Sequence, residues 1–270
     1  MTRSLRAVLY GAPIGTLGGL IGLGGAEFRL PVLKAAFGYA THRAVALNLA
    51  VSLLTLLGAL LIRVRVAPTG HLPSLAPILA ALIAGSIAGA YRGAAYASGL
   101  SVDRLERLVL VLLVAIGLGL AAEAFVSWGS PGVPGGLMVR LPLALVLGAA
   151  IGVVSSLLGV AGGELIIPTL VFIFGADIKT AGTASVLVSL PTVAVGIWCH
   201  GRSGAFADRL DLAGLIVPMG IGSIVGAVVG GYAVPYAPAR ALKLTLGVIL
   251  IGSAMRIFRH RPKLTAAEAP

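Results

Sequence analysis

Apolar residues run along this chain in long stretches that short groups of proline, glycine and charged residues interrupt. A helix needs roughly 20 apolar residues to span a bilayer, and many of the stretches approach this length. The pattern predicts apolar segments at residues 5–23, 26–37, 43–62, 75–98, 104–126, 141–159, 163–174, 181–199, 211–234 and 239–258. Apolar residues do not alternate with a period of two, so membrane-spanning strands are excluded. The chain is predicted to be an all-α polytopic membrane protein.

The second half of the chain repeats the first at a separation of 137 residues, the distance from Gly15 to Gly152. The same shift, without a gap, superposes residues 85–93 on residues 222–230. A duplicated hydrophobic unit is typical of transporters whose site lies between the two copies. Each half is predicted to hold a broken or re-entrant first segment followed by three transmembrane helices.

The repeat sets the predicted boundaries. Residues 1–126 form the first transmembrane repeat, residues 127–140 a Gly/Pro linker, residues 141–258 the second repeat, and residues 259–270 a basic cytoplasmic tail. The basic, then apolar start of the chain resembles a signal peptide. Its Gly-Ala-x-Ile-Gly pattern at residues 11–15 recurs inside the chain at residues 148–152, so we interpret the start as part of the mature protein.

Composition agrees with a membrane protein, because 58% of the 270 residues are hydrophobic and 11% are charged, against about 25% charged residues in soluble domains. The net charge of +11 comes from bases in predicted connections and tails, where lipid headgroups and topology account for them. No basic face with interleaved aromatic residues is present, so we expect no nucleic-acid binding. Cys199 is the single cysteine, and the histidines lack metal-ligand spacing. We expect no metal site, no cofactor and no catalytic residue.

Glycines cluster at two equivalent places, residues 22–25 and 159–163, and an acid and then a proline follow each cluster. Each glycine costs a helix about 1 kcal/mol relative to alanine, and proline removes a backbone donor, so both places are predicted to unwind. Unwound backbone at membrane depth must be buried in protein or line a wet cavity, where its amides and the helix ends can bind an ion or anion. The two breaks are therefore the predicted site.

The acids that follow the breaks, Glu27 and Glu164, allow two interpretations. Each acid can cap the short helix after its break, because a negative charge is favoured at a helix N-terminus. Each can also carry a proton during transport, because acids inside membranes are typically functional. The sequence leaves both roles open.

Arg29 has no charged counterpart in the second copy, where Ile166 stands. It can neutralise Glu27 or bind an anionic substrate, although we favour a cytoplasmic position in which the side chain extends to the membrane surface. Polar residues also recur on the helices that follow the breaks, where they bond neighbouring helices or contact substrate. The candidate substrate-binding residues are Gly24, Gly25, Glu27, Arg29, Asn48, Ser52, Gly162, Gly163, Glu164, Thr183, Ser185 and Ser189.

Small residues recur four apart at positions 85, 89 and 93 and again at 222, 226 and 230, as they do at 11, 15 and 19. Such faces let helix backbones approach closely in a membrane. We favour packing within the chain over a homodimer contact, and the homodimer remains a possible partner interaction.

Basic residues place both termini in the cytoplasm, with eleven arginines and lysines inside and six outside. The six include Lys179 in either arrangement of the copies, and Arg63 only when the copies are inverted. The ratio is the same whether the copies are parallel or inverted, so charge does not decide between the two arrangements.

The paired motifs Gly22-x-Gly-Gly-x-Glu-x-x-x-Pro31 and Gly159-x-x-Gly-Gly-Glu-x-x-x-Pro168 resemble those of the sulfite exporter TauE/SafE family of membrane transporters. An alanine-rich stretch follows each motif, at residues 44–48 and 181–185. The resemblance covers nearly the whole chain and implies two inverted halves, export or uptake of small sulfur-containing or organic anions, and proton coupling. Asn48 stands where the second copy has Ser185, which leaves the substrate open.

We therefore expect a secondary transporter of the inner membrane that moves sulfite, an organosulfonate or a related anion, with Glu27 and Glu164 exchanging protons. Its expected partners are the small anion and the lipid bilayer. Two alternatives are a passive anion channel and an intramembrane enzyme such as a lipid pyrophosphate phosphatase. The enzyme is disfavoured because the breaks supply only one acid each and a single arginine.

Overall fold

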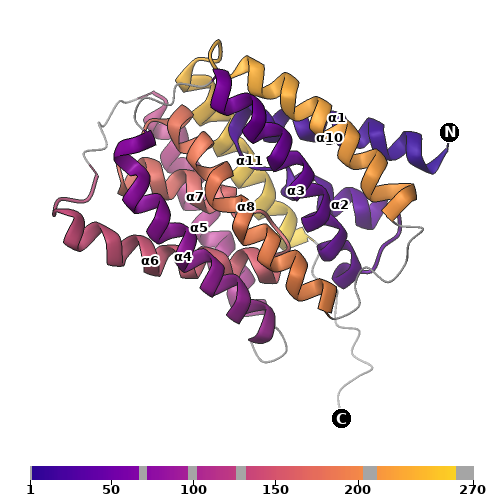
Figure 1. Cartoon of the computed structure of the whole chain (residues 1–270), viewed down its shortest axis with the longest axis horizontal. Helices are drawn as coiled ribbons and strands as arrows, with labels where there is room; N and C mark the ends of the chain where they lie inside the picture. The colour runs from indigo at the N-terminus through magenta and orange to yellow at the C-terminus, as the bar shows by residue number, and fades with distance from the viewer. Residues whose placement is uncertain (1, 67–71, 97–101, 126–131, 203–211, 260–270) are drawn as a thin grey trace.

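The computed structural model describes residues 2–66, 72–96, 102–125, 132–202 and 212–259, which contain helices and no strand. The first half of the chain forms α1 (Arg3–Ile21), α2 (Ala26–Ala35), α3 (Thr41–Val66), α4 (Leu72–Tyr96) and α5 (Val102–Glu123). The second half forms α6 (Leu137–Leu158), α7 (Gly163–Pro168), the π-helix η1 (Thr169–Ile173), α8 (Ile178–Arg202), the π-helix η2 (Leu212–Ile216), α10 (Val217–Ala233) and α11 (Ala239–Arg259). The predicted order of segments is confirmed (Figure 1).

Five helices in the described part of the chain are long and apolar enough to cross a membrane. They lie at Arg43–Val66, Leu72–Gly93, Leu137–Leu158, Ile178–Arg202 and Ala213–Ala233. Helix α6 begins at Leu137, so the last residues of the predicted linker are helical. The predicted basic tail lies almost wholly outside the described residues.

Both predicted breaks are present, and glycines with positive φ produce them. Helix α1 ends at Gly22 (φ 97°), and α2 begins after Gly25 (φ 73°). Helix α6 ends at Gly159 (φ 67°), and α7 begins after Gly162 (φ 78°). Residues with a Cβ rarely adopt this left-handed conformation, which explains the glycines.

The prolines after the breaks lie within helix, inside the predicted segments 26–37 and 163–174, so the unwinding is confined to the glycine clusters. Pro31 lies inside α2, and Pro168 ends α7, where the helix continues as η1. The π-helix η1 begins directly after Pro168, and the Phe174 amide closes one of its wider turns on the Thr169 carbonyl at 3.3 Å.

The small-residue faces pack against other helices of the same chain. The glycines of α4 at positions 85, 89 and 93 lie against the backbone of α6 at Leu145, Ala149 and Val153. The glycines of α10 at positions 222, 226 and 230 lie in the same way against α1 at Val8, Ala12 and Thr16. A Cβ at most of these glycines would collide with backbone, so the close approach requires them. Packing within the chain is confirmed, and the homodimer remains a prediction.

The α4–α6 contact and the α10–α1 contact are equivalent, with the roles of the two halves exchanged. Shifting the α4 residues forward and the α6 residues back by the repeat length turns every α4–α6 pair into an α10–α1 pair. Such reciprocal contacts are the signature of an approximate two-fold relation. The equivalent residues Gly24 and Ala161 touch each other, so the axis of this relation passes between the two breaks.

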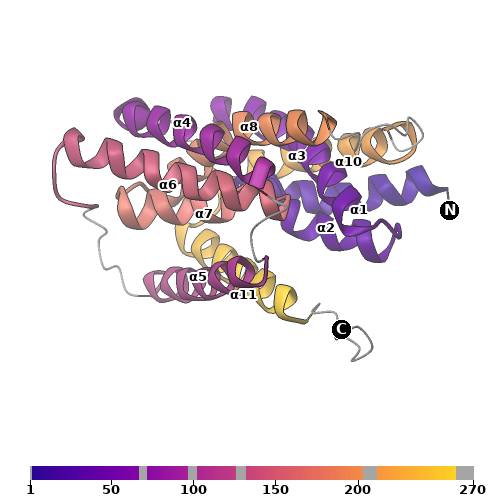
Figure 2. The same ribbon diagram turned by 90° about the horizontal axis from the view of Figure 1, so that it is seen from below.

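Equivalent helices of the two halves run antiparallel to each other. Residues that come later in α3 meet residues that come earlier in α8, because Leu49 lies beside Gly196 while Arg63 bonds Thr183. The same holds for α5 and α11, which form a separate layer along one side of the molecule (Figure 2). The two-fold axis is therefore roughly perpendicular to these helices.

Candidate functional site

The two breaks face each other in the interior of the protein. A Cβ built on Gly24 would lie 3.3 Å from Cβ of Ala161, and one built on Gly163 would lie 3.0 Å from Cα of Leu23. All four residues are buried. The predicted meeting of the two breaks is thus present for their backbones, which places unwound backbone from both halves at one point.

A polar side chain from each half bonds the break of the other half. Asn48 on α3 donates through Nδ2 to the carbonyl oxygen of Gly159 at 2.9 Å, and Ser185 on α8 donates through Oγ to that of Gly22 at 3.1 Å. Both carbonyls end a helix and lack a partner within it. Asn48 also donates to the carbonyl of Ala26 at 3.0 Å. These two predicted site residues therefore hold the breaks together across the axis.

Arg29 on α2 lies fully buried, so the favoured interpretation that it reaches the membrane surface is wrong. The helix directs it inward, against the polar face of α3. Nη1 donates to Ser52 Oγ at 2.9 Å and Nη2 to Thr55 Oγ1 at 2.9 Å. Longer bonds reach Asn48 Oδ1 at 3.5 Å, the Gly24 carbonyl at 3.2 Å and Ser223 Oγ at 3.4 Å. Three predicted site residues, Gly24, Asn48 and Ser52, thus meet Arg29.

All of these acceptors are neutral, and Nε of Arg29 has no hydrogen-bond partner. No carboxylate oxygen of the described residues lies within 4.0 Å of the guanidinium. A buried cation is costly when no opposite charge accompanies it. The surroundings of Arg29 therefore supply neutral hydrogen-bond acceptors, and Glu27 attracts the guanidinium over a longer distance without forming an ion pair.

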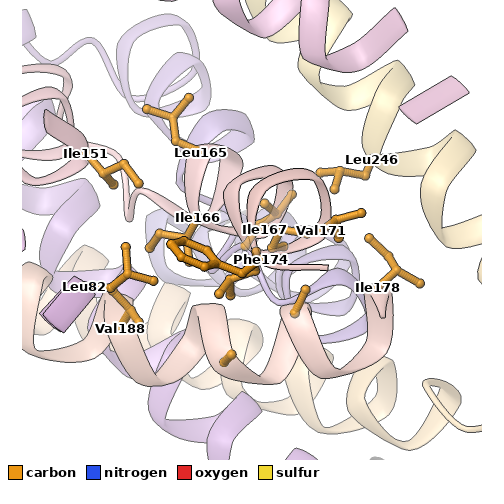
Figure 3. Packing of buried hydrophobic residues seen from close by; sticks show 14 of the residues in the cluster. Leu82, Ile151, Leu165, Ile166, Ile167, Val171, Phe174, Ile178, Val188 and Leu246 are labelled. Carbon is orange, nitrogen blue, oxygen red and sulfur yellow. The ribbon is translucent and has the colours of Figure 1, made fainter. Parts of the chain in front are cut away.

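The equivalent place in the second half is built differently. Ile166 stands at the position of Arg29 and packs near Leu82 and Val188 in the largest apolar cluster (Figure 3). The hydroxyls that correspond to Thr55 and Ser223 bond each other directly there, because Thr192 Oγ1 donates to Ser86 Oγ at 2.7 Å. The guanidinium of Arg29 therefore lies between Thr55 and Ser223, whereas the equivalent hydroxyls of Thr192 and Ser86 bond each other.

Both acids after the breaks are buried, with Glu27 9% and Glu164 6% exposed. They lie in the first turns of α2 and α7, as predicted. Neither oxygen of Glu27 has a hydrogen-bond partner, and Oε1 of Glu164 has none. A hydrogen-bonded cap by Glu27 is therefore absent, although its charge still lies at the favourable end of the helix.

The remaining predicted site residues are Gly25, Gly162, Ser189 and Thr183, and they do not all lie beside Arg29. Gly25 and Gly162 form the breaks themselves, as the residues that precede α2 and α7. Ser189 is buried, and its hydroxyl has no partner. Thr183 is bonded instead to Arg63, whose Nε donates to its Oγ1 at 3.2 Å.

The sequence interpretation placed Arg63 in the connection after residues 43–62, and this was wrong. Helix α3 continues to Val66, and Arg63 is fully buried where α1, α3 and α8 meet. Its Nη1 donates to the carbonyls of Gly19 at 2.8 Å and Leu20 at 3.0 Å, near the end of α1. Its Nη2 donates to the carbonyl of Lys179 at 3.1 Å. A cation is favourable at a helix C-terminus, so Arg63 fixes the end of α1 that leads into the first break.

An all-helical chain with several apolar spans, a duplicated core and unwound backbone buried at its centre defines an integral membrane transporter. The model of the sulfite exporter TauE/SafE family matches residues 1–120 and 144–270. The chain therefore belongs to this family of membrane transporters. No curated protein and no solved structure matches the chain.

Replacing Arg63 by glutamine should lower the free energy of unfolding by about 2–4 kcal/mol, because several buried carbonyls lose a charged donor. Arg65→Gln is the matched control, since Arg65 is exposed two residues further along α3, and its effect should stay within about 0.5 kcal/mol. Denaturant unfolding of the purified variants in detergent measures both values. Equal stability of the two variants would contradict the role assigned to Arg63.

Proposed function

We propose that this protein is a secondary transporter that moves small sulfur-containing anions, such as sulfite or an organosulfonate, across the inner membrane in a proton-coupled cycle. Both termini lie in the cytoplasm in this proposal. The family supports transport of sulfur anions, and the buried site between the breaks supports binding near the middle of the membrane.

The single observation that carries the proposal is the buried guanidinium of Arg29, which forms no ion pair within 4.0 Å. Its guanidinium is buried, bonded only to neutral oxygens, and has a free Nε donor. A sulfite or sulfonate group carries several oxygens on one sulfur, and a guanidinium binds two such oxygens at once. An anion bound here exchanges its hydration shell for Arg29, and the hydroxyls of Ser52 and Thr55 can reorient toward it.

The two acids supply the proton-carrying groups of the proposed cycle. Glu27 lies two residues from Arg29, is buried, and leaves both oxygens without a hydrogen bond. Glu164 occupies the equivalent place and leaves one oxygen without a partner. An acid with unpaired oxygens inside the membrane can take up a proton on one side and release it on the other.

The halves are proposed to be inverted across the membrane and to rock about the axis between the breaks. Equivalent helices run antiparallel, as α3 and α8 do, which is the relation expected of inverted repeats. In this arrangement the breaks stay near the axis, and the bound anion is exposed to each side in turn.

Replacing Arg29 by glutamine should reduce sulfite flux at least about tenfold, because a buried charged hydrogen bond is worth about 1.5–3 kcal/mol. The measurement is flux of labelled sulfite in proteoliposomes, with and without a pH gradient. Arg65→Gln is the control and should retain the flux of the unmodified protein. A flux that does not respond to the pH gradient would identify a passive channel, and absence of flux in the unmodified protein would refute transport of sulfite.

Replacing both Glu27 and Glu164 by glutamine should abolish proton-coupled flux while leaving the shape of the site unchanged. The two single variants assign the role, because only replacement of the acid that carries the proton should abolish coupling. The measurement is the sulfite gradient that an imposed pH gradient can drive in proteoliposomes. Unaltered coupling in the double variant would remove the proton-carrying role from both residues.

A further inference from the structure

The two halves meet at two equivalent contacts beside the breaks. In the α1–α8 contact, Gly22 at the end of α1 faces Gly182 near the start of α8. In the α6–α3 contact, Gly159 at the end of α6 faces Val45 near the start of α3. The repeat relates the two contacts, because Gly22 corresponds to Gly159 and Val45 to Gly182.

The two contacts lie toward opposite faces of the membrane. Val45 lies in the first two turns of α3, and Arg63, which lies at the α1–α8 contact, is in the last turn. The rise of the helix between them is about 27 Å, close to the thickness of a bilayer core. The α6–α3 contact lies toward the face of the N-terminus, since Arg3 at the start of α1 donates to the hydroxyl of Tyr39 just before α3.

The helices approach each other more closely in the α1–α8 contact. A Cβ built on Gly22 would meet the backbone of Gly182, with the Cα of Gly182 2.9 Å away. A Cβ built on Gly159 would instead meet the side chain of Val45, with the Cβ of Val45 2.9 Å away. Backbone therefore lies on backbone in the first contact, whereas a valine side chain separates the helices in the second.

Arg63 bonds the two sides of the α1–α8 contact to each other. Its guanidinium donates to four acceptors on α1 and α8, the carbonyls of Gly19, Leu20 and Lys179 and the hydroxyl of Thr183. The repeat puts His200, which is partly exposed, at the position of Arg63. An imidazole has two ring nitrogens against five guanidinium N–H donors, so His200 cannot make an equivalent set of bonds.

The cavity on the Arg63 face does not reach the breaks. It is half open, has a volume of about 270 Å³, and is lined by Ile178 and Lys179 at the start of α8 and by the ion pair of Glu123 and Lys243. Its lining contains no residue of either glycine cluster, all of which the structure describes. The carbonyl of Lys179 accepts from Arg63, so the cavity lies directly beside the α1–α8 contact.

We propose that Arg63 locks the α1–α8 contact as a closed gate, so that the resting protein opens its site through the α6–α3 contact. This inference rests on the transport function proposed above, in which the face of the N-terminus is cytoplasmic. The resting protein then takes its anion from the cytoplasm. Release on the opposite side requires Arg63 to leave its four acceptors, so the two equivalent gates open at unequal cost.

Two equivalent buried alanines provide reporters for the gates, Ala44 beside Val45 and Ala181 beside Gly182. Each alanine is replaced singly by cysteine in the full chain that carries Cys199→Ser, which removes the single native thiol. The measurement is the rate of reaction with a water-soluble maleimide in detergent, because access to a buried thiol follows local opening. The thiol of Ala44→Cys should react at least about tenfold faster than that of Ala181→Cys.

Arg63→Gln should raise the reaction rate of Ala181→Cys at least about fivefold without raising that of Ala44→Cys. Loss of overall structure would raise both rates, so the pair of reporters separates opening of the gate from unfolding. Gly182→Ala, paired with a cysteine at Ala181, is a second route, because its Cβ would collide with the backbone of α1 while Arg63 stays in place. Arg65→Gln is the control and should leave both rates unchanged, since Arg65 is exposed.

A rate at Ala181→Cys that rises in neither variant would overturn the proposal, and so would an equal rise at both reporters. Equal or reversed rates of the two reporters without a further substitution would overturn the assignment of the resting state. These reactions contain no sulfite, so their outcome is independent of the flux measurements. A protein that fails to transport sulfite would refute the proposed substrate and leave the labelling pattern to decide the gate.

Discussion

The structure depends on one constraint, the need to provide hydrogen bonds for backbone that unwinds inside a membrane protein. The carbonyls that end α1 and α6 have no partner within their own helices, and water is not available to replace it. The protein meets this need across the two-fold axis, because Asn48 bonds the break of the second half and Ser185 bonds that of the first. Neither half can satisfy its break alone, so the two copies must form together.

The same constraint explains the close packing around the breaks. The helices that lead into them, α1 and α6, are held by glycine-lined contacts with α10 and α4, which bring backbone against backbone. Arg63 adds a charged donor at the end of α1. The first break is therefore fixed by Arg29 of α2, Arg63 of α3 and Ser185 of α8. Its geometry is set before any ligand binds.

On this symmetric frame the protein carries an asymmetric charge. Arg29 of the first half separates Thr55 from Ser223, whereas the counterparts Thr192 and Ser86 bond each other directly. The difference between arginine and isoleucine at this position thus gives one half a buried guanidinium and the other an apolar side chain. The break is present in both halves, but only the first half has a guanidinium beside it.

The sequence predicted the helices, the breaks and the repeat because glycine clusters, apolar length and self-similarity are local or periodic signals. It predicted Asn48 and Ser185 as site residues but not their bonds across the axis, since such contacts depend on how the halves pack. Arg29 and Arg63 were misplaced because a charged residue in an apolar run is usually assigned to a membrane surface. Their burial depends on acceptors from distant segments, such as Ser223 and Lys179, which no local pattern reveals.

The most direct test of this account is the number of sulfite ions that bind one chain at saturation. Equilibrium dialysis of the purified protein against labelled sulfite gives this number without any assumption about transport. The account predicts one ion per chain, because only the first half carries a guanidinium at this position. Two equivalent ions per chain would contradict it, since the repeat would then provide two anion sites in spite of Ile166.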